Sequence, residues 1–415
     1  MTQAIPLPSQ RPRPSGAPLA LDGLRVVDFS HFIAGPLATM FLADMGAEVI
    51  KVENPDGGDD SRQMKPPEVG GEGHFYLAFN RNKKSIAIDM KAPAGLDLVH
   101  RLAAQSDVLV ENFRPGVTAR LGVDYATISK LNARLIYCSI SAYGQQGMMS
   151  ARPGLDPIFQ AEMGLMSVTG AVDGEPMRHP ISIIDLFTSL YASTAITAAI
   201  VDQRTTGAGR HIDVSLMGGA VSALSNAAQY YFASGETQPR MGNGFPTVVP
   251  VGAFAGSDGD LFYLACGTER LYQNLVVKAL ARPDLAADPR FRTMALRVHN
   301  RDSFMLLLQE IFSAKPRNHW VEVLRAASVP CGPVRSIAEA LESPEVIEAG
   351  LVQTLKHPTA GDLRTLRSPI GLPEGPHRQD TAPPLLGEHT DDVLRTTLNL
   401  DETTLASLRK ERVIL

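Results

Sequence analysis

The chain has 415 residues, of which 44% are hydrophobic and 20% are charged, and its formal net charge is -5 at pH 7. This composition excludes a disordered or fibrous protein and predicts a soluble globular one with more than one domain. The negative net charge also excludes the strongly basic surface that nucleic-acid binding requires.

The first 20 residues are rich in proline, serine and arginine and are predicted to form a disordered tail rather than a signal peptide. No later segment approaches the roughly 18 uninterrupted apolar residues of a membrane helix, so no membrane contact is expected. The three cysteines, Cys138, Cys266 and Cys331, are far apart and odd in number. This spacing favours neither a disulfide framework nor a metal site, and it suits a reducing, cytoplasmic location.

After this tail, short apolar runs bounded by turn residues alternate with segments of helical periodicity. The first three, at 24–30, 35–47 and 48–54, predict a strand, a helix and a strand, which together make a βαβ unit. Further strands are predicted at 84–90, 107–113, 135–141 and 210–216, and further helices at 94–105, 126–133 and 182–203. This alternation predicts an α/β fold with a doubly wound parallel sheet and helices on both faces.

The character of the sequence changes after about Gly242. A shorter strand is predicted at 261–266 and amphipathic helices at 272–280 and 302–312, which is consistent with a smaller α+β domain. Near the C-terminus, 382–394 predicts a proline-rich linker followed by a capped helix. We therefore predict a large domain at 21–225, a small domain at 226–335 and a C-terminal segment at 336–415 that returns to the large domain.

The loops that follow the predicted strands lack the motifs often found in folds of this type. No glycine-rich dinucleotide fingerprint, phosphate loop, zinc-binding helix or nucleophile elbow is present. Asn112 and Phe113 offer an amide and an aromatic face for a nucleotide base, although a phenylalanine after a strand often belongs to the core. Other loop residues are cations suited to phosphate, with solvated surface charges as the alternative: Arg62, Lys91, Arg114 and Arg120.

Two carboxylates in these loops are candidates for chemistry, Asp156 in PGLDPIFQ and Asp173 in TGAVDGEP. Either could be a helix cap or a turn residue, because an Asp before Gly commonly bonds its own backbone in a turn. An ionised carboxylate can also act as a covalent nucleophile toward an acyl group when its site holds it desolvated and aligned. The residue types alone leave both interpretations open.

Six segments, in order from about Leu24 to the C-terminal end, resemble the family III CoA-transferases of the CaiB/BaiF type, which include formyl-CoA transferase and carnitine CoA-transferase. They are DFSHFIAGPLATMFLADMGAEVIKVENP, FNRNKKSIAIDMK, VLVENFRPGV, GLMSVTGAVDGEP, VPCGPV and PPLLGEHTDDVL. The resemblance implies a Rossmann-like large domain, a small domain and a homodimer of two interlocked rings. It also implies acyl-CoA and a carboxylic acid as substrates, with no metal and no permanently bound cofactor.

The resemblance assigns the role of nucleophile to Asp173. In the family the aspartate attacks the donor acyl-CoA to give a mixed anhydride, and the released CoA thiolate then forms an aspartyl-CoA thioester. The acceptor carboxylate attacks this thioester, and CoA returns to yield the new acyl-CoA. The glycine-rich flap that covers the thioester in the family corresponds here to RMGNGFP, which has only Gly242 and Gly244.

By position, the resemblance also assigns the contacts with CoA. They are Ile33, Ala34, Asn54, Ile88 to Lys91, Asn112, Phe113, Arg114, Arg120 and the loop from Tyr143. Asn54 and Tyr143 stand where the formyl-CoA enzymes have basic residues. The phosphate contacts are therefore expected to be redistributed, with Arg62 as the candidate to take them over.

Two other functions remain open from the sequence. α-Methylacyl-CoA racemases of the same superfamily use a histidine and an aspartate at the position of Asp156, but the stretch 122–144 contains no histidine. A non-catalytic acyl-CoA binding protein is also compatible with the two replaced basic residues. For the substrate, Arg178 and His179 could pair with the distal carboxylate of a dicarboxylic acid, which favours succinyl-CoA as donor; the alternative is that both are surface residues.

Overall fold

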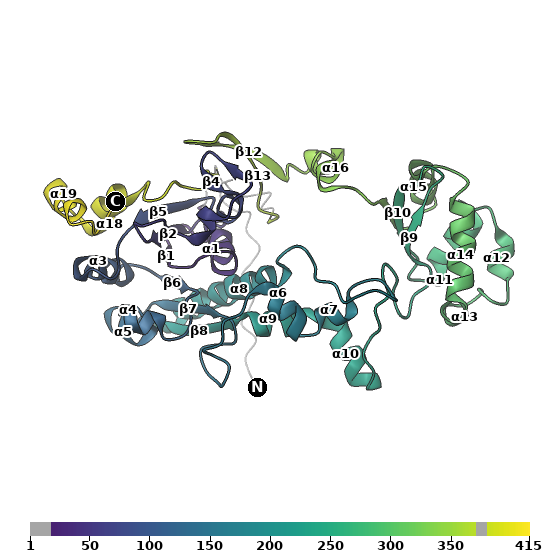
Figure 1. Ribbon diagram of the computed structural model, residues 1–415, viewed down its shortest axis with the longest axis horizontal. Coiled ribbons are helices and arrows are strands. Elements are labelled where there is room, and N and C mark those ends of the chain that lie inside the picture. Colours follow the sequence, from purple (N-terminus) through teal and green to yellow (C-terminus); the bar gives the residue numbers. More distant parts are fainter. Residues whose placement is uncertain (1–17, 371–379) are drawn as a thin grey trace. The chain divides into compact units, whose positions relative to one another are not determined.

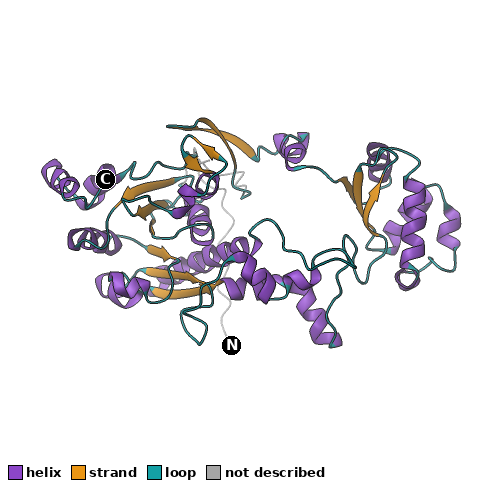
Figure 2. Ribbon diagram, in the orientation of Figure 1, coloured by secondary structure: helices purple, strands orange, loops and turns teal. Residues whose placement is uncertain are grey.

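The computed structural model describes residues 18–370 and 380–415 (Figures 1 and 2). Contacts between residues divide the chain into two compact units. The large unit comprises Met1–Phe159, Ile181–Ala223 and Ala349–Leu415, and the small unit comprises Gln160–Pro180 and Leu224–Glu348. The predicted disordered tail, 1–20, lies outside the described residues except for 18–20.

A six-stranded sheet in the order β5-β2-β1-β6-β7-β8 forms the centre of the large unit. Every neighbouring pair of strands is parallel, which confirms the predicted parallel sheet. The strands are β1 (Arg25–Asp28), β2 (Glu48–Glu53), β5 (Lys83–Ala87), β6 (Val108–Glu111), β7 (Ile136–Ser141) and β8 (Arg210–Ser215). The strand order reverses between β1 and β6, and sheets of this kind bind ligands at such a switch point, outside the carboxyl ends of the strands.

Helices and short hairpins surround this sheet (Figure 2). The helices of the large unit are α1 (Ala34–Asp44), η1 (Asp60–Gln63), α2 (His74–Phe79), α3 (Pro93–Ala104), α4 (Val117–Leu121), α5 (Tyr125–Leu131), α8 (Ile183–Thr206), α9 (Leu216–Ala223), α18 (Thr390–Leu398) and α19 (Glu402–Lys410). The hairpins pair β3 (Glu68–Val69) with β4 (Glu72–Gly73), and β12 (Val352–His357) with β13 (Gly361–Leu366).

The C-terminal helices belong to the core of the large unit. Leu394, Leu408 and Ile414 are buried in one apolar cluster with Val27 of β1 and Leu102 of α3. Helix α18 contacts both α3 and β5, and Figure 1 shows these elements side by side near the yellow end of the chain. The C-terminal segment therefore completes one face of the sheet.

Helix α8 is long and apolar enough, by length and composition alone, to cross a membrane. It packs against α1, α9, β7 and β8 within the large unit, and 44% of its most apolar window is buried there. Core helices of soluble proteins also pass this test of length and composition, so the test alone is weak evidence for a membrane span.

The small unit combines an antiparallel sheet, in the order β11-β10-β9, with several helices. Phe254, Phe262, Phe312 and Trp320 pack in its core, mostly edge to face, at ring-centroid distances of 5.0 to 6.1 Å. The strands are β9 (Val251–Ala255), β10 (Leu261–Ala265) and β11 (Cys331–Pro333). The helices are α7 (Leu165–Val168), α10 (Ser225–Ser234), α11 (Glu269–Gln273), the π-helical turn η2 (Asn274–Ala279), α12 (Pro283–Ala287), α13 (Met294–His299), α14 (Arg301–Phe312), α15 (Arg317–Ala326), α16 (Ile337–Leu341) and α17 (Pro344–Glu348).

The units divide the chain differently from the predicted boundaries at two places. Residues 160–180 group with the small unit rather than with the large domain, because their backbone is hydrogen-bonded to the loop that begins at Arg240. Residues 336–348, which form α16 and α17, also group with the small unit. Helix α6 (Asp156–Glu162) begins in the large unit and ends in the small one.

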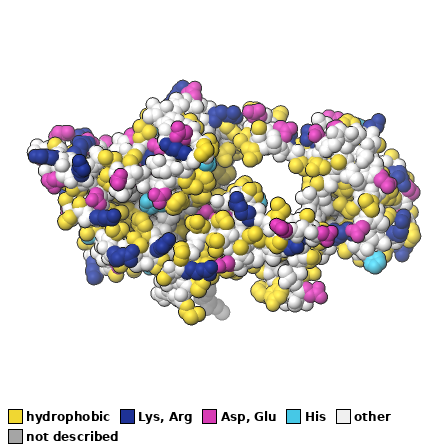
Figure 3. All heavy atoms as spheres, viewed as in Figure 1, with side chains coloured by type: hydrophobic (Ala, Val, Ile, Leu, Met, Phe, Trp, Pro, Cys, Tyr) yellow, Lys and Arg dark blue, Asp and Glu magenta, His cyan; other side chains and the backbone are white. Residues whose placement is uncertain are grey.

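On the face shown in Figure 3, basic, acidic and hydrophobic side chains are interspersed.

Candidate active site

The residues that were predicted to contact CoA follow the carboxyl ends of the parallel strands. Ile33 and Ala34 come after β1, Asn54 directly after β2, and Ile88 directly after β5. Asn112 to Arg114 follow β6, and Tyr143 follows β7. Because these ends lie along one edge of the sheet, the large unit gathers the predicted positions on the edge where such folds bind ligands.

Asn112 joins the loops after β1 and β6 across the switch point. The His31 backbone N–H donates to Asn112 Oδ1, and Asn112 Nδ2 donates to His31 O, both at 2.8 Å. The next residue, Phe32, has a φ of 63°, in the left-handed region that non-glycine residues rarely adopt. The paired hydrogen bonds thus help to hold a strained loop whose following residues, Ile33 and Ala34, were predicted to contact CoA.

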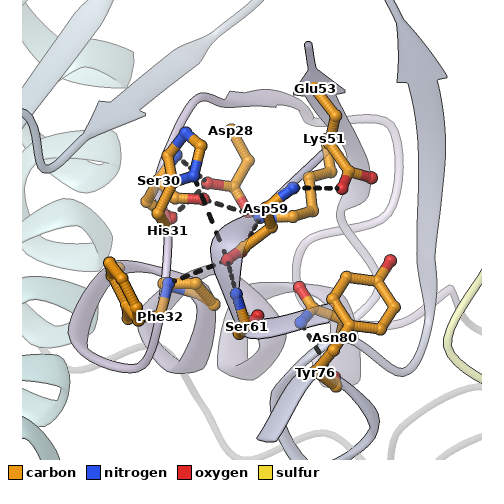
Figure 4. A network of polar contacts seen from close by, with 12 residues as sticks. Asp28, Ser30, His31, Phe32, Lys51, Glu53, Asp59, Ser61, Tyr76 and Asn80 are labelled. Atoms are coloured by element: carbon orange, nitrogen blue, oxygen red, sulfur yellow. Dashed lines mark hydrogen bonds and ion pairs between the residues drawn. The ribbon is translucent and has the colours of Figure 1, made fainter. Parts of the chain in front are cut away.

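A buried charge network lies behind this loop (Figure 4). The ammonium group of Lys51, on β2, lies 2.9 Å from Asp59 Oδ2 and donates to Ser30 O at 2.6 Å. Asp59 Oδ1 accepts the Phe32 backbone N–H at 3.2 Å. Although burial opposes ionisation, the charge of Lys51 and the hydrogen bonds from Lys51 and the Ser61 backbone N–H hold the pKa of Asp59 well below its usual range. Burial and the charge of Lys51 lower the pKa of His31, so this side chain is neutral near pH 7.

A cavity of about 600 Å³, here called the switch-point cavity, opens between the loops after β1, β6 and β7. Its walls are largely apolar and include Phe32, Phe75, Ile140 and Leu155. Five of the predicted CoA-contact residues line it: Ile33, Ala34, Asn112, Phe113 and Arg114. A volume of this size is typical of a small-molecule site.

Two carboxylates, Asp156 and Asp185, also line the switch-point cavity. Asp156 Oδ2 accepts the backbone N–H groups of Ile184 and Asp185, at 2.6 and 3.3 Å, and so satisfies free donors in the first turn of α8. Burial, and then the charge of Asp156, raise the pKa of Asp185 to about 7. Asp185 was not singled out from the sequence, where it is indistinguishable from an acidic residue in the first turn of an apolar helix.

Three more of the predicted residues, Asn54, Asp89 and Lys91, line a second and more open cavity of about 780 Å³ at the ends of β2 and β5. We call it the edge cavity. The remaining predicted residues line neither cavity. Tyr143 and Ile88 are buried, and Arg120 is exposed beside the turn at Gly116.

The structure contradicts the expectation that Arg62 takes over contacts with phosphate. Its guanidinium donates twice to Glu53 and once to Glu72, each at 2.8 Å, and lies 3.6 Å over the ring of Tyr76. Only 3% of Arg62 is exposed. Each nitrogen of the guanidinium donates to one of these carboxylates. Arg62 is therefore a structural residue under the loop after β2.

Asp173 lies in the small unit, in a tight turn closed by the Gly174 N–H donating to Ala171 O at 3.1 Å. Its side chain is exposed. The turn follows Gly170, whose φ is 127° and where a Cβ would come within 2.7 Å of Glu175 O. Only glycine fits this position without strain, which explains the small residue ahead of the turn.

The loop that corresponds to the family flap braces the Asp173 turn from within the same unit. The Gly242 N–H donates to Gly170 O at 3.0 Å, and Arg240 Nη2 donates to Gly174 O at 2.9 Å. Gly244 closes its own turn by donating to Met241 O at 2.8 Å. The predicted nucleophile and the predicted flap glycines are therefore neighbours.

Arg178 and His179 are exposed in the segment that follows this turn. The backbone of His179 is fixed by Gln160, whose amide accepts its N–H at 2.7 Å and donates to its carbonyl at 3.2 Å. Among residues 18–370 and 380–415, no group of three or more His, Cys, Asp or Glu side chains is placed to hold a metal ion.

A parallel sheet of this topology, with ligand-sized cavities at its carboxyl edge, defines an α/β protein of the class that binds ligands at a switch point. The chain belongs to CoA-transferase family III, whose family model matches residues 21–390. The family predicted from the sequence is thus confirmed, and with it an enzyme that transfers CoA.

Named relatives and a solved structure extend over nearly the whole chain. Succinyl-CoA:glutarate CoA-transferase of Homo sapiens is 38% identical over 395 residues, 95% of this chain and 90% of that protein. Succinate--glutarate CoA-transferase of Agrobacterium fabrum is 37% identical over 92% of this chain and 97% of that protein. A CaiB/BaiF family protein from Brucella suis is 35% identical, with a TM-score of 0.83 over 92% of this chain and 100% of that one.

Proposed function

We propose that this enzyme moves CoA from an acyl-CoA donor to a carboxylic acid through covalent intermediates on Asp173. The observation that carries the proposal is the position of Asp173 in a family III chain. Its exposed carboxylate lies at a tight turn whose backbone is hydrogen-bonded on both sides of the turn. A carboxylate nucleophile needs access to the acyl group and a fixed backbone beneath it, and we propose that bound acyl-CoA supplies the desolvation that the exposed side chain lacks in the free chain.

In the first half of the proposed reaction, an Asp173 oxygen attacks the thioester carbonyl of the donor. The C–S bond breaks, CoA leaves as thiolate, and a mixed anhydride forms. The thiolate then attacks the Asp173 carbonyl, which releases the donor acid and leaves an aspartyl-CoA thioester. Thioester and anhydride are close in energy, so the activation of the acyl group is retained without ATP.

In the second half, the acceptor carboxylate attacks the aspartyl thioester and releases the thiolate again. The thiolate attacks the acceptor's carbonyl in the new anhydride, giving the new acyl-CoA and free Asp173. Retaining CoA beside the anhydride makes each step effectively unimolecular, which can lower the barrier by ~7 to 11 kcal/mol. We propose that the cavities at the sheet edge of the large unit retain it.

We propose succinyl-CoA as donor and a dicarboxylic acid as acceptor. The relatives named for glutarate and the acetyl-CoA:oxalate CoA-transferase of Acetobacter aceti, 36% identical over 367 residues, all carry a dicarboxylate in their names. Arg178 and His179, exposed after the Asp173 turn, are cationic or cation-forming groups for the distal carboxylate. Replacing Arg178 by alanine should weaken the preference for dicarboxylates if this pairing exists.

We also propose that the enzyme is a homodimer of interlocked chains. In the isolated chain, large apolar side chains are exposed on α8 of the large unit and on α10 of the small unit. Exposed apolar surface of this kind commonly marks a protein interface.

The proposed chemistry is tested by trapping the intermediate. The enzyme is incubated with succinyl-CoA, quenched with borohydride or hydroxylamine, and analysed by intact mass and peptide mapping. We expect a modification at Asp173 in the wild type and none in Asp173→Ala, whereas Asp258→Ala, at another Asp-Gly turn, should be modified like the wild type.

The contrary result is equally specific. If no acyl-CoA modifies Asp173, and the enzyme instead exchanges the α-proton of a branched acyl-CoA in deuterated water in a manner that depends on Asp156, racemase chemistry replaces the proposed transfer. Binding of CoA with neither modification nor exchange would indicate a non-catalytic binding protein.

A further inference from the structure

The end of the chain lies against the stretch after β5 that was predicted to bind CoA. The backbone N–H of Asp89 donates to Val413 O at 2.8 Å, and Ile88 pairs with Ile414 in an antiparallel bridge. Both Val413 and Ile414 are buried in the core of the large unit. Arg412, which directly precedes this pairing, is therefore held in a defined position.

Arg412 has a backbone conformation that arginine disfavours. It follows the end of α19 with a φ of 58°, in the left-handed region where a helix usually ends with glycine or asparagine. Glycine would adopt this conformation without strain. Strained residues often occur at functional sites, so the arginine side chain is a candidate for a role of its own.

The side chain of Arg412 lines the edge cavity together with Lys91 and Asn54. The charged groups that also line this cavity are Arg409, Asp56 and Asp89. Arg409 is already ion-paired with Asp391 on α18. Asp89 Oδ1 accepts the backbone N–H of Lys91 at 2.9 Å, so one of its carboxylate oxygens is hydrogen-bonded within the loop.

In the described parts of the chain, the side chains of Lys91 and Arg412 form no ion pair, and both are exposed to the cavity. Asn54 stands where formyl-CoA enzymes are expected to carry a cation, and Arg62 cannot replace that cation because Glu53 and Glu72 hold its guanidinium. Besides Lys91, Arg412 is therefore a second cation of the edge cavity whose side chain forms no ion pair in the described parts of the chain.

We infer that Arg412 binds a phosphate group of the 3′-phospho-ADP part of acyl-CoA, opposite Lys91 in the edge cavity. The inference rests on the proposed function, because it takes acyl-CoA as the ligand. Guanidinium is suited to bidentate contact with phosphate, whereas the neutral amide of Asn54 offers only an uncharged hydrogen bond. The C-terminal turn thereby replaces a cation that the loop after β2 lacks.

The test compares Arg412→Gly with the wild type. Glycine removes the side chain and relieves the backbone strain, so this variant should fold at least as well as the wild type by thermal denaturation. We expect its KM for succinyl-CoA to rise roughly tenfold, with kcat and the KM for the dicarboxylate acceptor nearly unchanged. Arg412→Lys should recover part of the loss, and Lys410→Ala, an exposed residue at the end of the same helix, should have no effect.

A second donor, 3′-dephospho-succinyl-CoA, identifies the phosphate. If Arg412 binds the 3′-phosphate, Arg412→Gly loses the preference of the wild type for the phosphorylated donor. If Arg412 binds the diphosphate, the substitution raises the KM for both donors by the same factor. A KM within about twofold of the wild type for both donors would overturn the inference. Calorimetric titration of CoA into both proteins decides the question even if no transfer occurs, because the dissociation constant does not depend on the chemistry at Asp173.

Discussion

Asp185 shows how burial beside the switch-point cavity changes the chemistry of a single residue. Burial and the charge of Asp156 raise its pKa from 3.8 to about 7. In the unfolded chain the Asp185 carboxyl has its ordinary pKa of 3.8. Between pH 3.8 and about pH 7 this carboxyl is therefore protonated in the folded state but ionised in the unfolded state. Folding stability is therefore lost as the pH rises through this window, and none of this penalty exists below the lower value.

We predict that Asp185→Asn increases the free energy of unfolding near pH 8 by about 1 to 3 kcal/mol relative to the wild type. The difference should shrink as the pH falls and vanish by about pH 4, because both forms are then neutral. Urea denaturation at several pH values measures this directly. Asp302→Asn, an exposed aspartate in the first turn of α14, serves as the control and should show no such trend. A constant difference at all pH values would show that the effect is steric rather than electrostatic.

At the scale of elements, the loop from Arg240 to Gly244 is the support of the Asp173 turn. Arg240 holds the turn through Gly174 O, while Gly242 holds it through Gly170 O. These bonds hold the backbone of the turn that carries the proposed nucleophile. Loosening such a turn should slow the reaction more than it weakens the binding of acyl-CoA.

We predict that Arg240→Ala lowers kcat about tenfold or more, with little change in the KM for acyl-CoA. The rate at which the Asp173 adduct forms, followed by rapid quenching and mass spectrometry, should fall by the same factor. Arg292→Ala removes an exposed arginine from the same unit and provides the matched control. An Arg240→Ala variant with a raised KM and normal kcat would indicate that this arginine binds the substrate instead.

Elements formed by local patterns were predictable from the sequence, whereas assignments that depend on distant partners were not. The strands β2, β6 and β7 each contain a short run of apolar residues, and members of these runs, such as Ile50 and Leu109, are fully buried, as is typical of strands in a parallel sheet. Arg62 lies in a run of charged residues that reads as a solvated loop. Its guanidinium is held by Glu53 and Glu72 and also donates to Pro384 O, 322 positions later, a partner that no local pattern reveals.

The site residues, like the elements, include some that local sequence could indicate and others that depend on contacts between distant parts of the chain. The resemblance to the family, rather than the residue types, selected Asp173 as the candidate nucleophile, and the alternation of strands and helices selected the loops at the ends of the strands. The raised pKa of Asp185 and the position of Arg412 depend on α6 and on the C-terminal turn, which no local pattern connects to the loops they reach. The boundary at 160–180 escaped prediction for the same reason, since the hydrogen bonds to Arg240 and Gly242 define it.

At the scale of the whole molecule, the exposed apolar side chains are the property that an isolated chain does not explain. Val201 on α8 is 62% exposed, and Phe232 on α10 is 74% exposed. Exposed apolar surface of this kind is expected to be buried when two chains assemble. If two chains are interlocked as rings, they cannot separate without unfolding, so the assembly should resist dilution.

We predict a native mass of twice 44.7 kDa by sedimentation equilibrium, unchanged over a hundredfold dilution. Phe232→Glu places a charge on the apolar surface of α10 and should reduce the yield of dimer on refolding, because burying an unpaired charge is strongly unfavourable. Gln229→Glu adds the same charge at an exposed polar position of the same helix and should assemble normally. A mass that falls toward that of one chain on dilution would show a conventional, reversible interface, and a single-chain mass at every concentration would rule out the dimer altogether.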